Sequence, residues 1–112
     1  MSDYRLKENI QPPSNVLDRL CSIRMFNYEW KDISIFKKND TLHLGFYAHD
    51  LQETFPEING IVQGKKDAVN DEGEIQPQSV EPEFCNVLMK AIIELNAKVE
   101  KLSNRIIELE SN

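Results

Sequence analysis

The sequence has little cysteine, no long apolar run and no cluster of basic residues. Its apolar stretches are only a few residues long, whereas roughly 20 are needed to span a bilayer, and none follows Met1. We therefore predict a soluble chain with no export signal and no membrane partner. Thirteen Lys and Arg against nineteen Asp and Glu give a net charge of -6, which argues against nucleic acid as a direct partner.

The sequence also lacks any recognisable pattern of metal ligands. Cys21 and Cys85 are far apart and do not form the C-x-x-C spacing of zinc sites and redox motifs, so we predict two buried thiols in a reducing compartment. Four other candidate ligands likewise match no known spacing: His43, His49, Asp50 and Glu53. No metal and no cofactor is predicted.

The length of 112 residues, 40% of them hydrophobic, suits one domain but gives a lone monomer a limited core, so self-association is expected to help. We predict a single domain with three zones: an N-terminal arm (1–13), a globular head (14–81) and a C-terminal helix (82–112). The arm is expected to be a short ordered segment or a strand. It stops at Pro12–Pro13, which bars a helix from continuing into the head.

The sequence patterns of the head predict a mixture of short helices and antiparallel strands, which is an α+β fold. Ser14 is placed to cap a helix over residues 15–22. The apolar stripe of this helix is expected to be core: Val16, Leu17, Leu20 and Cys21. A second short helix is predicted over residues 49–55, with Leu51 and Phe55 on its inner side and Pro56 at its end.

Two alternating segments between these helices predict a hairpin. Phe26, Tyr28 and Trp30 alternate with polar residues, as do Leu42, Leu44 and Phe46, and the turn residues 37–40 lie between them. This pattern places His43 on the polar side of its strand and predicts a bulge or a close backbone approach at Gly45. Residues 57–78 are mostly polar and are expected to form a surface loop or an extended hairpin.

The C-terminal helix carries a heptad pattern that continues for four repeats without a polar residue in the seam. The a positions are Cys85, Ile92, Val99 and Ile106, and the d positions are Leu88, Leu95, Leu102 and Leu109. Taken alone, β-branched a residues with Leu at d favour a dimer slightly over a trimer. For residues 84–93, intramolecular core and intermolecular seam are equally supported, because apolar residues widen the stripe there. Residues 95–109 are better explained as a seam between chains.

The N-terminal arm holds a Ser and a Lys five residues apart, Ser2 and Lys7. A serine that attacks a peptide bond needs a base, and a lysine serves only where burial or a like charge favours its neutral form. Leu6 and Ile10 are candidates to supply such a dry pocket. His43 and His49 are alternative bases, for which structural or solvent-facing roles are the better interpretation. By itself the spacing of Ser2 and Lys7 carries almost no information.

The surrounding residues are more specific. The run from Ser2 to Ile10 (SDYRLKENI) resembles the S-D-x-R-L-K-x-N-I signature that opens the self-cleaving intramolecular chaperones of phage tail fibres and tailspikes, peptidase family S74. The resemblance continues in order along nearly the whole chain. It includes Leu17 to Leu20, Phe26 to Tyr28, Leu44 to Ala48, Phe55 to Glu57 and Ala91 to Asn96.

The resemblance implies a trimeric coiled coil at the C-terminal helix and an upstream fibre or tailspike chain as the folding client. It also implies single-turnover autoproteolysis immediately before Ser2, with Ser2 as nucleophile and Lys7 as general base. Because only Met1 precedes Ser2, we expect this chain to correspond to the released fragment. The expected location is the host cytoplasm during virion assembly, and the mature virion is expected to lack the domain.

Two other interpretations stay open at this stage. The chain is alternatively a trimerisation module that does not cleave, or the related self-cleaving segment of a membrane-tethered transcription factor. Cleavage of a longer chain separates the first from the chaperone, and a flanking DNA-binding domain would identify the second. A general protease is the least favoured, since nothing in the sequence suggests a substrate cleft.

Overall fold

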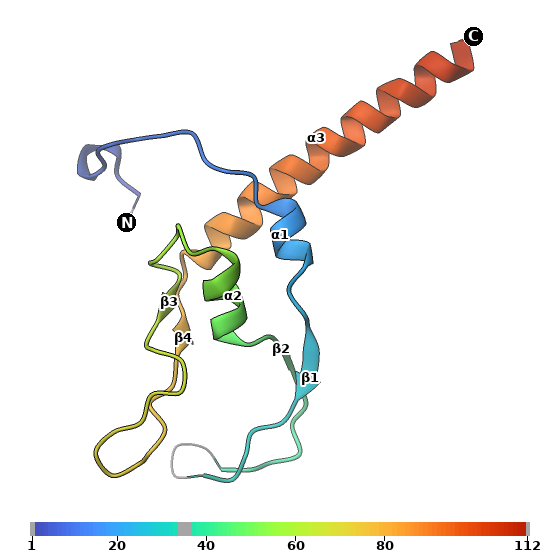
Figure 1. Cartoon of the computed structure of the whole chain (residues 1–112). Coiled ribbons are helices and arrows are strands. Elements are labelled where there is room, and N and C mark those ends of the chain that lie inside the picture. Colours follow the sequence, from blue (N-terminus) through green and yellow to red (C-terminus); the bar gives the residue numbers. More distant parts are fainter. Residues whose placement is uncertain (1, 34–36, 112) are drawn as a thin grey trace.

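The computed structural model describes residues 2–33 and 37–111 of the chain. A small head of short helices and two-stranded hairpins carries one long C-terminal helix that projects from it (Figure 1). The Cα radius of gyration is 19.5 Å, whereas a compact chain of this length has about 13 Å. The predicted α+β class with a long terminal helix is confirmed, and the excess radius reflects the projecting helix.

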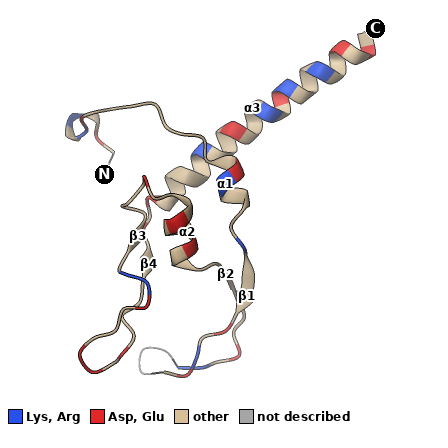
Figure 2. Ribbon diagram, viewed as in Figure 1, with Lys and Arg blue, Asp and Glu red and all other residues tan. Residues whose placement is uncertain are grey.

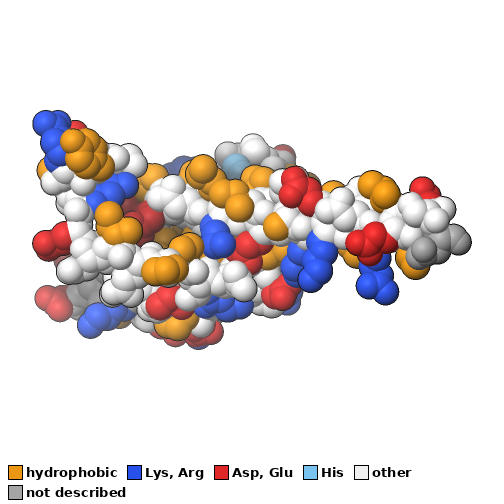
Figure 3. All heavy atoms as spheres, turned by 90° about the horizontal axis from the view of Figure 1, so that it is seen from above, with side chains coloured by type: hydrophobic (Ala, Val, Ile, Leu, Met, Phe, Trp, Pro, Cys, Tyr) orange, Lys and Arg blue, Asp and Glu red, His pale blue; other side chains and the backbone are white. Residues whose placement is uncertain are grey.

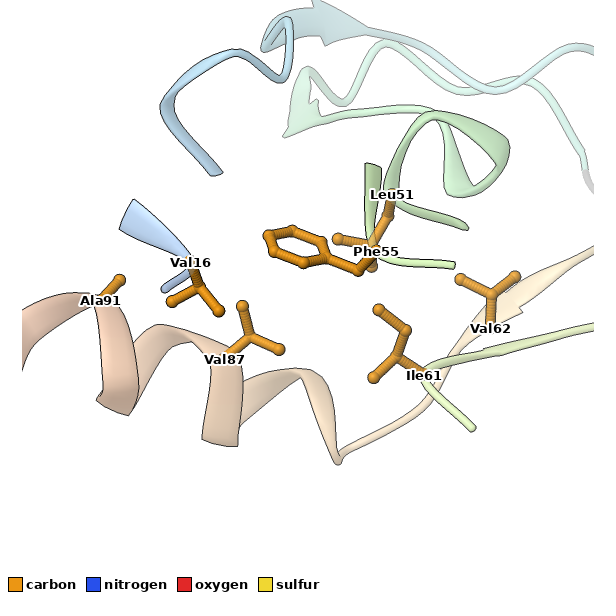
Figure 4. Close-up of a cluster of buried hydrophobic side chains, with 7 residues drawn as sticks. All are labelled: Val16, Leu51, Phe55, Ile61, Val62, Val87 and Ala91. Carbon is orange, nitrogen blue, oxygen red and sulfur yellow. The ribbon is translucent and has the colours of Figure 1, made fainter. Parts of the chain in front are cut away.

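The core of the head is centred on helix α2 (Ala48–Thr54). Leu51 and Phe55 lie four residues apart, so they share one face, and both are fully buried as predicted. Pro56 follows and has no N–H with which to continue the helix. Figure 4 shows Phe55 at the centre of the buried cluster, which consists of Val16, Leu51, Phe55, Ile61, Val62, Val87 and Ala91.

Helix α1 (Leu17–Cys21) is shorter than predicted, and Ser14 does not cap it. Its N-cap position is Val16, which has no side-chain acceptor for the free backbone amides. Leu17 and Leu20 pack against the core, but Cys21 is exposed at the end of the helix. The prediction of two buried thiols is wrong for this chain by itself, because Cys85 is also exposed.

The predicted hairpin forms between β1 (Phe26–Tyr28) and β2 (His43–Gly45), which pair antiparallel. Its register places His43 opposite Tyr28, where the two rings stack with centroids 5.4 Å apart. His43 therefore shares the half-buried face, and the prediction that it lies on the polar side is wrong. Leu44 is opposite Asn27 on the exposed face.

Gly45 was predicted to mark a bulge or a close backbone approach, but the group that lies close to it is the side chain of Tyr28. A Cβ atom at this position would lie 2.8 Å from Cε1 of Tyr28, closer than van der Waals contact allows. The absence of a side chain lets the Tyr28 ring lie across β2. A larger residue at this position would require the Tyr28 ring to move.

Residues 57–78 belong to an extended hairpin, one of the two alternatives that the sequence left open. Strand β3 (Val62–Gln63) pairs antiparallel with β4 (Ser79–Val80), and a further bridge joins Val69 to Ile75. At the tip, the Asn70 side chain accepts hydrogen bonds from the backbone amides of Glu72 and Glu74, each at 2.9 Å. Such Asx contacts stabilise a tight turn.

Helix α3 (Phe84–Ser111) begins two residues after Pro82 and has 28 residues, about 42 Å at 1.5 Å per residue. Its first turns pack on the head through Phe84, Val87 and Ala91, and the C-terminal part of the helix projects away from the head (Figure 1). Acidic and basic residues are interspersed along the projecting part (Figure 2). In the described part of the chain, no helix combines the length and apolar character needed to cross a membrane.

Candidate functional site

The N-terminal arm contains one ordered turn, the 3-10 helix η1 (Tyr4–Leu6). Asp3 caps it by accepting a hydrogen bond from the backbone N–H of Arg5 at 3.0 Å. The Arg5 guanidinium also donates to both carboxylate oxygens of Asp3, at 3.1 and 2.7 Å. These contacts lower the pKa of Asp3 and raise that of Arg5, because each charge stabilises the other.

This turn brings the two predicted catalytic residues together. Lys7 lies directly after η1, and its backbone N–H donates to the Tyr4 carbonyl at 3.3 Å. The Lys7 Nζ atom then lies 3.0 Å from Ser2 Oγ and donates a hydrogen bond to it. This separation is within the range over which a base and a serine hydroxyl exchange a proton.

The pocket predicted around this pair is not formed within the chain. Leu6 and Ile10 are 67% and 82% exposed, so neither shields the lysine from water. Every described residue of the arm is exposed, and the arm extends away from α1 (Figure 1). Within one chain the arm therefore offers no enclosed pocket around Ser2 and Lys7.

Residues 15–17, where the arm joins α1, form the base of the arm. Two charged side chains hold this segment, and neither of them was identified from the sequence. Glu94 of α3 accepts hydrogen bonds from the backbone N–H groups of Val16, at 2.9 Å, and Leu17, at 3.4 Å. Arg19 donates to the Asn15 carbonyl at 2.9 Å. Glu94 thereby takes over the capping role that was predicted for Ser14.

Arg19 also connects the base of the arm to the end of α2. It donates to the Glu57 carboxylate at 2.7 Å and to the Thr54 carbonyl at 3.2 Å, and its guanidinium lies 4.6 Å from the Phe55 ring centroid. No short-range sequence signal could have revealed Glu94 or Arg19 in these roles. Their partners lie up to 78 residues away along the chain.

The two histidines considered as alternative bases lie in the head. His43 stacks on Tyr28, and His49 stacks on Tyr47 with its Nε2 3.4 Å from Asp50 Oδ1. Neither approaches Ser2 through any contact that the structure shows. Among the described residues, no group of three His, Cys, Asp or Glu side chains is arranged to hold a metal ion.

The predicted heptad seam of α3 is exposed along its whole length. Its apolar residues apart from Cys85 have between 39% and 67% of their surface accessible: Leu88, Ile92, Leu95, Val99, Leu102, Ile106 and Leu109. Figure 3 shows hydrophobic side chains reaching the surface along the projecting helix, interleaved with charged ones. A contiguous apolar stripe of this length marks an interaction surface.

The core-facing and seam-facing residues of proximal α3 are separate. Val87 and Ala91 are buried against the head, while the neighbouring seam residues Leu88 and Ile92 face water. Within one chain, one face of residues 84–93 thus belongs to the core, and the residues of the predicted seam are left exposed. Met89 and Ile93, which widened the predicted stripe, are exposed.

The fold and these contacts define a class: a small α+β head that joins an arm bearing a hydrogen-bonded Ser–Lys pair to a long helix with an exposed apolar stripe. The family model of Peptidase S74, described as chaperone of endosialidase, matches residues 2–59. This match covers more than half of the chain, and the protein belongs to that family. Comparison with curated proteins gave no match.

Membership of Peptidase S74 implies self-cleaving peptidase activity in general, and membership of a chaperone family implies a client protein. The matched region contains the arm, α1, the β1–β2 hairpin and α2. The β3–β4 hairpin and α3 lie outside it. The identity of the client and the state of assembly are therefore matters for inference from the residues themselves.

Proposed function

We propose that this protein is a trimeric intramolecular chaperone of an upstream phage tail fibre or tailspike. It aligns and folds that client and then releases itself by cutting the chain immediately before Ser2. The observation that carries the proposal is the 3.0 Å hydrogen bond between Lys7 Nζ and Ser2 Oγ. It joins the two residues that the family resemblance assigns to nucleophile and base.

The chemistry is an acyl shift followed by hydrolysis. Neutral Lys7 accepts the proton of the Ser2 hydroxyl while Oγ attacks the carbonyl carbon of the residue before Ser2. The bond from that carbon to the Ser2 nitrogen breaks, the nitrogen takes up the proton, and an ester remains on Oγ. Water then hydrolyses the ester, which yields a carboxylate on the client and restores the hydroxyl. Each chain carries out one turnover as a self-cleaving serine endopeptidase.

The exposed seam of α3 supports the association of chains that the proposal requires. Three helices in parallel would bury the a and d residues that one chain leaves in water, and burial of apolar surface contributes about 25 cal/mol per Å². The heptads alone favour a dimer slightly, and the family resemblance supports three chains. At the flanks, Arg105 at a g position and Glu110 at the following e position are placed to pair between chains.

Assembly would also complete the cleavage site. In one chain the arm is exposed and Lys7 is open to water. In the trimer with its client attached, folded fibre and neighbouring heads would surround the arm and exclude water. Cleavage would therefore occur only after the client has folded, so that only assembled fibres are released.

The chaperone would shorten the conformational search by which the three client chains find their common register. Three fibre chains must begin in register, and bringing their ends together costs loop-closure entropy before any contact rewards it. A C-terminal trimer removes most of that cost. The β3–β4 hairpin and the exposed strands of the head are proposed to contact the growing fibre. We place this activity in the host cytoplasm during virion assembly, with the domain absent from the mature virion.

The test uses a longer chain in which the upstream fibre sequence precedes Ser2. Wild type is expected to give two bands on a denaturing gel, whereas Ser2→Ala and Lys7→Ala stay as one. Matched controls are Ser14→Ala and Lys66→Ala, which alter an exposed serine and lysine outside the arm and should cleave normally. Full cleavage of Ser2→Ala or Lys7→Ala would overturn the dyad. An uncleaved wild-type trimer would instead identify a pure trimerisation module.

A further inference from the structure

Glu94 lies at the junction of the two parts of the molecule that the proposed function must couple. Only 13% of its side-chain surface is exposed, and Lys90 Nζ lies 3.9 Å from its Oε2. Its carboxylate oxygens accept hydrogen bonds from the Val16 and Leu17 amides, at the point where the arm enters the head. A charged acceptor makes such bonds about twice as strong as a neutral one.

The same turn of α3 contributes to the seam. Ile92 and Leu95, at a and d positions, lie on other sides of the helix and are 67% and 51% exposed. The Val16 side chain packs in the core with Val87 and Ala91, and Glu94 adds a direct hydrogen bond to the Val16 backbone N–H, from which the chain continues into the arm. The arm then leaves this fixed point through Pro12–Pro13, whose backbone φ angles are restricted.

We propose that Glu94 is the positioning residue for self-cleavage: it fixes the base of each arm to the helix that forms the trimer axis. This inference rests on the proposed function and adds to it how assembly reaches the cleavage site. Three seams packed around one axis place three Glu94 side chains at equivalent positions. Each holds its arm at a set distance from the axis, so Ser2 and the bond before it meet the same surroundings in every chain.

A second polar contact between α3 and α1, the ion pair of Lys98 with Asp18, is more exposed than the contact of Glu94. Lys98 Nζ lies 3.3 Å from Asp18 Oδ1, also between α3 and α1, but Asp18 is 91% exposed and Lys98 is 57% exposed. Exposed ion pairs contribute little to stability. This pair therefore serves as a matched control, because it links the same two helices without holding the backbone of the arm.

The principal experiment measures the rate of self-cleavage in the longer chain, with trimer mass followed by light scattering. Glu94→Ala is expected to form trimers and to cleave about 10- to 100-fold more slowly, since small misplacements of reacting groups cost that much. Glu94→Gln keeps a carbonyl oxygen that accepts one hydrogen bond and should give an intermediate rate. Lys98→Ala should stay within about twofold of wild type. A Glu94→Ala trimer that cleaves at the wild-type rate overturns the inference.

A second variant covers the case in which Glu94→Ala fails to assemble. A trimeric coiled coil is fused in heptad register after residue 112, which restores the trimer without restoring the contact to the arm. Continued slow cleavage supports a positioning role. Recovery of the wild-type rate shows that Glu94 acts only through assembly and overturns it. The Ser2→Ala chain, run in parallel, separates these results from failure of the dyad, because only then would wild type and Ser2→Ala behave alike.

A third readout needs no cleavage at all. In the 112-residue chain, the Val16 and Leu17 amides should exchange with solvent more slowly than those of the arm. Glu94→Ala should abolish that protection while amides of α2 keep theirs. Unchanged protection at Val16 and Leu17 in the Glu94→Ala chain would show that Glu94 does not hold the base of the arm.

Discussion

The head and the distal half of α3 (residues 95–111) use apolar residues in opposite ways. In the head, Leu51, Phe55 and Ile61 come from segments that fold back on one another, and one chain buries them completely. In the distal helix, Leu95, Leu102 and Leu109 leave more than half of their surface in water. The head therefore completes its own core, whereas the distal helix leaves its apolar residues uncovered within one chain.

The proximal part of α3 (residues 84–94) has buried apolar residues on one face and exposed apolar residues on another. Val87 and Ala91 are buried against the head, Leu88 and Ile92 of the predicted seam are exposed, and Glu94 connects the helix to the base of the arm. The helix therefore joins the two regions.

The largest effect is expected from charges in the distal seam. Leu95→Asp with Leu102→Asp would bury like charges at the trimer axis, so we expect complete loss of the trimer while the head keeps its structure. Light scattering measures the mass, and near-ultraviolet circular dichroism reports the aromatic packing of the head. The control is Lys101→Asp with Asn104→Asp, which changes residues outside the seam. A double seam variant of unchanged mass would contradict the proposed interface.

A core substitution tests whether the head is stabilised by its own buried cluster. Phe55→Ala removes the side chain at the centre of the buried cluster and the ring over which Arg19 lies. We expect a loss of about 3–5 kcal/mol in the free energy of unfolding, measured by urea denaturation at fixed chain concentration. Tyr4→Ala, which removes an exposed aromatic side chain from the arm, should change it by less than about 0.5 kcal/mol. Equal losses would show that the core is wrongly placed.

Adjacent residues of proximal α3 provide a finer test. Val87→Ala should lower the free energy of unfolding by about 1–3 kcal/mol, because it leaves a cavity against the head. Leu88→Ala should act mainly on assembly and make the trimer dissociate at higher chain concentration. Sedimentation at several concentrations distinguishes the two. If both substitutions shift dissociation alike, the two faces of the helix are not separate.

The smallest effect concerns the turn that holds Ser2 near Lys7. Arg5 lowers the pKa of Asp3, so the carboxylate contributes to the turn above its ordinary value of 3.8 and loses that contribution as pH falls through the lowered pKa. In Arg5→Ala the midpoint of Asp3 titration, followed by NMR, should rise towards 3.8. A midpoint that stays at its wild-type position would show that Arg5 does not act on Asp3. Glu8→Ala serves as the control.

Local patterns were sufficient for many elements. The spacing of Leu51 and Phe55 with Pro56 after them predicted α2 within one residue, and alternation predicted the β1–β2 hairpin. The same local reasoning failed for Ser14, His43 and the two cysteines. Each of these depends on what lies opposite in space. His43 shares a face with Tyr28 because of the register, and Glu94 displaces Ser14 as the cap of α1.

The class of fold, the heptad pattern and the family signature around Ser2 and Lys7 could be predicted from the sequence, because they reside in spacing and in contiguous residues. The folded chain was needed to show which face of proximal α3 packs on the head, which side chains hold the base of the arm and that the arm is exposed in a single chain. Those outcomes depend on contacts between residues as far as 78 positions apart, such as Val16 and Glu94. No local periodicity encodes which distant acceptor a free backbone amide will meet.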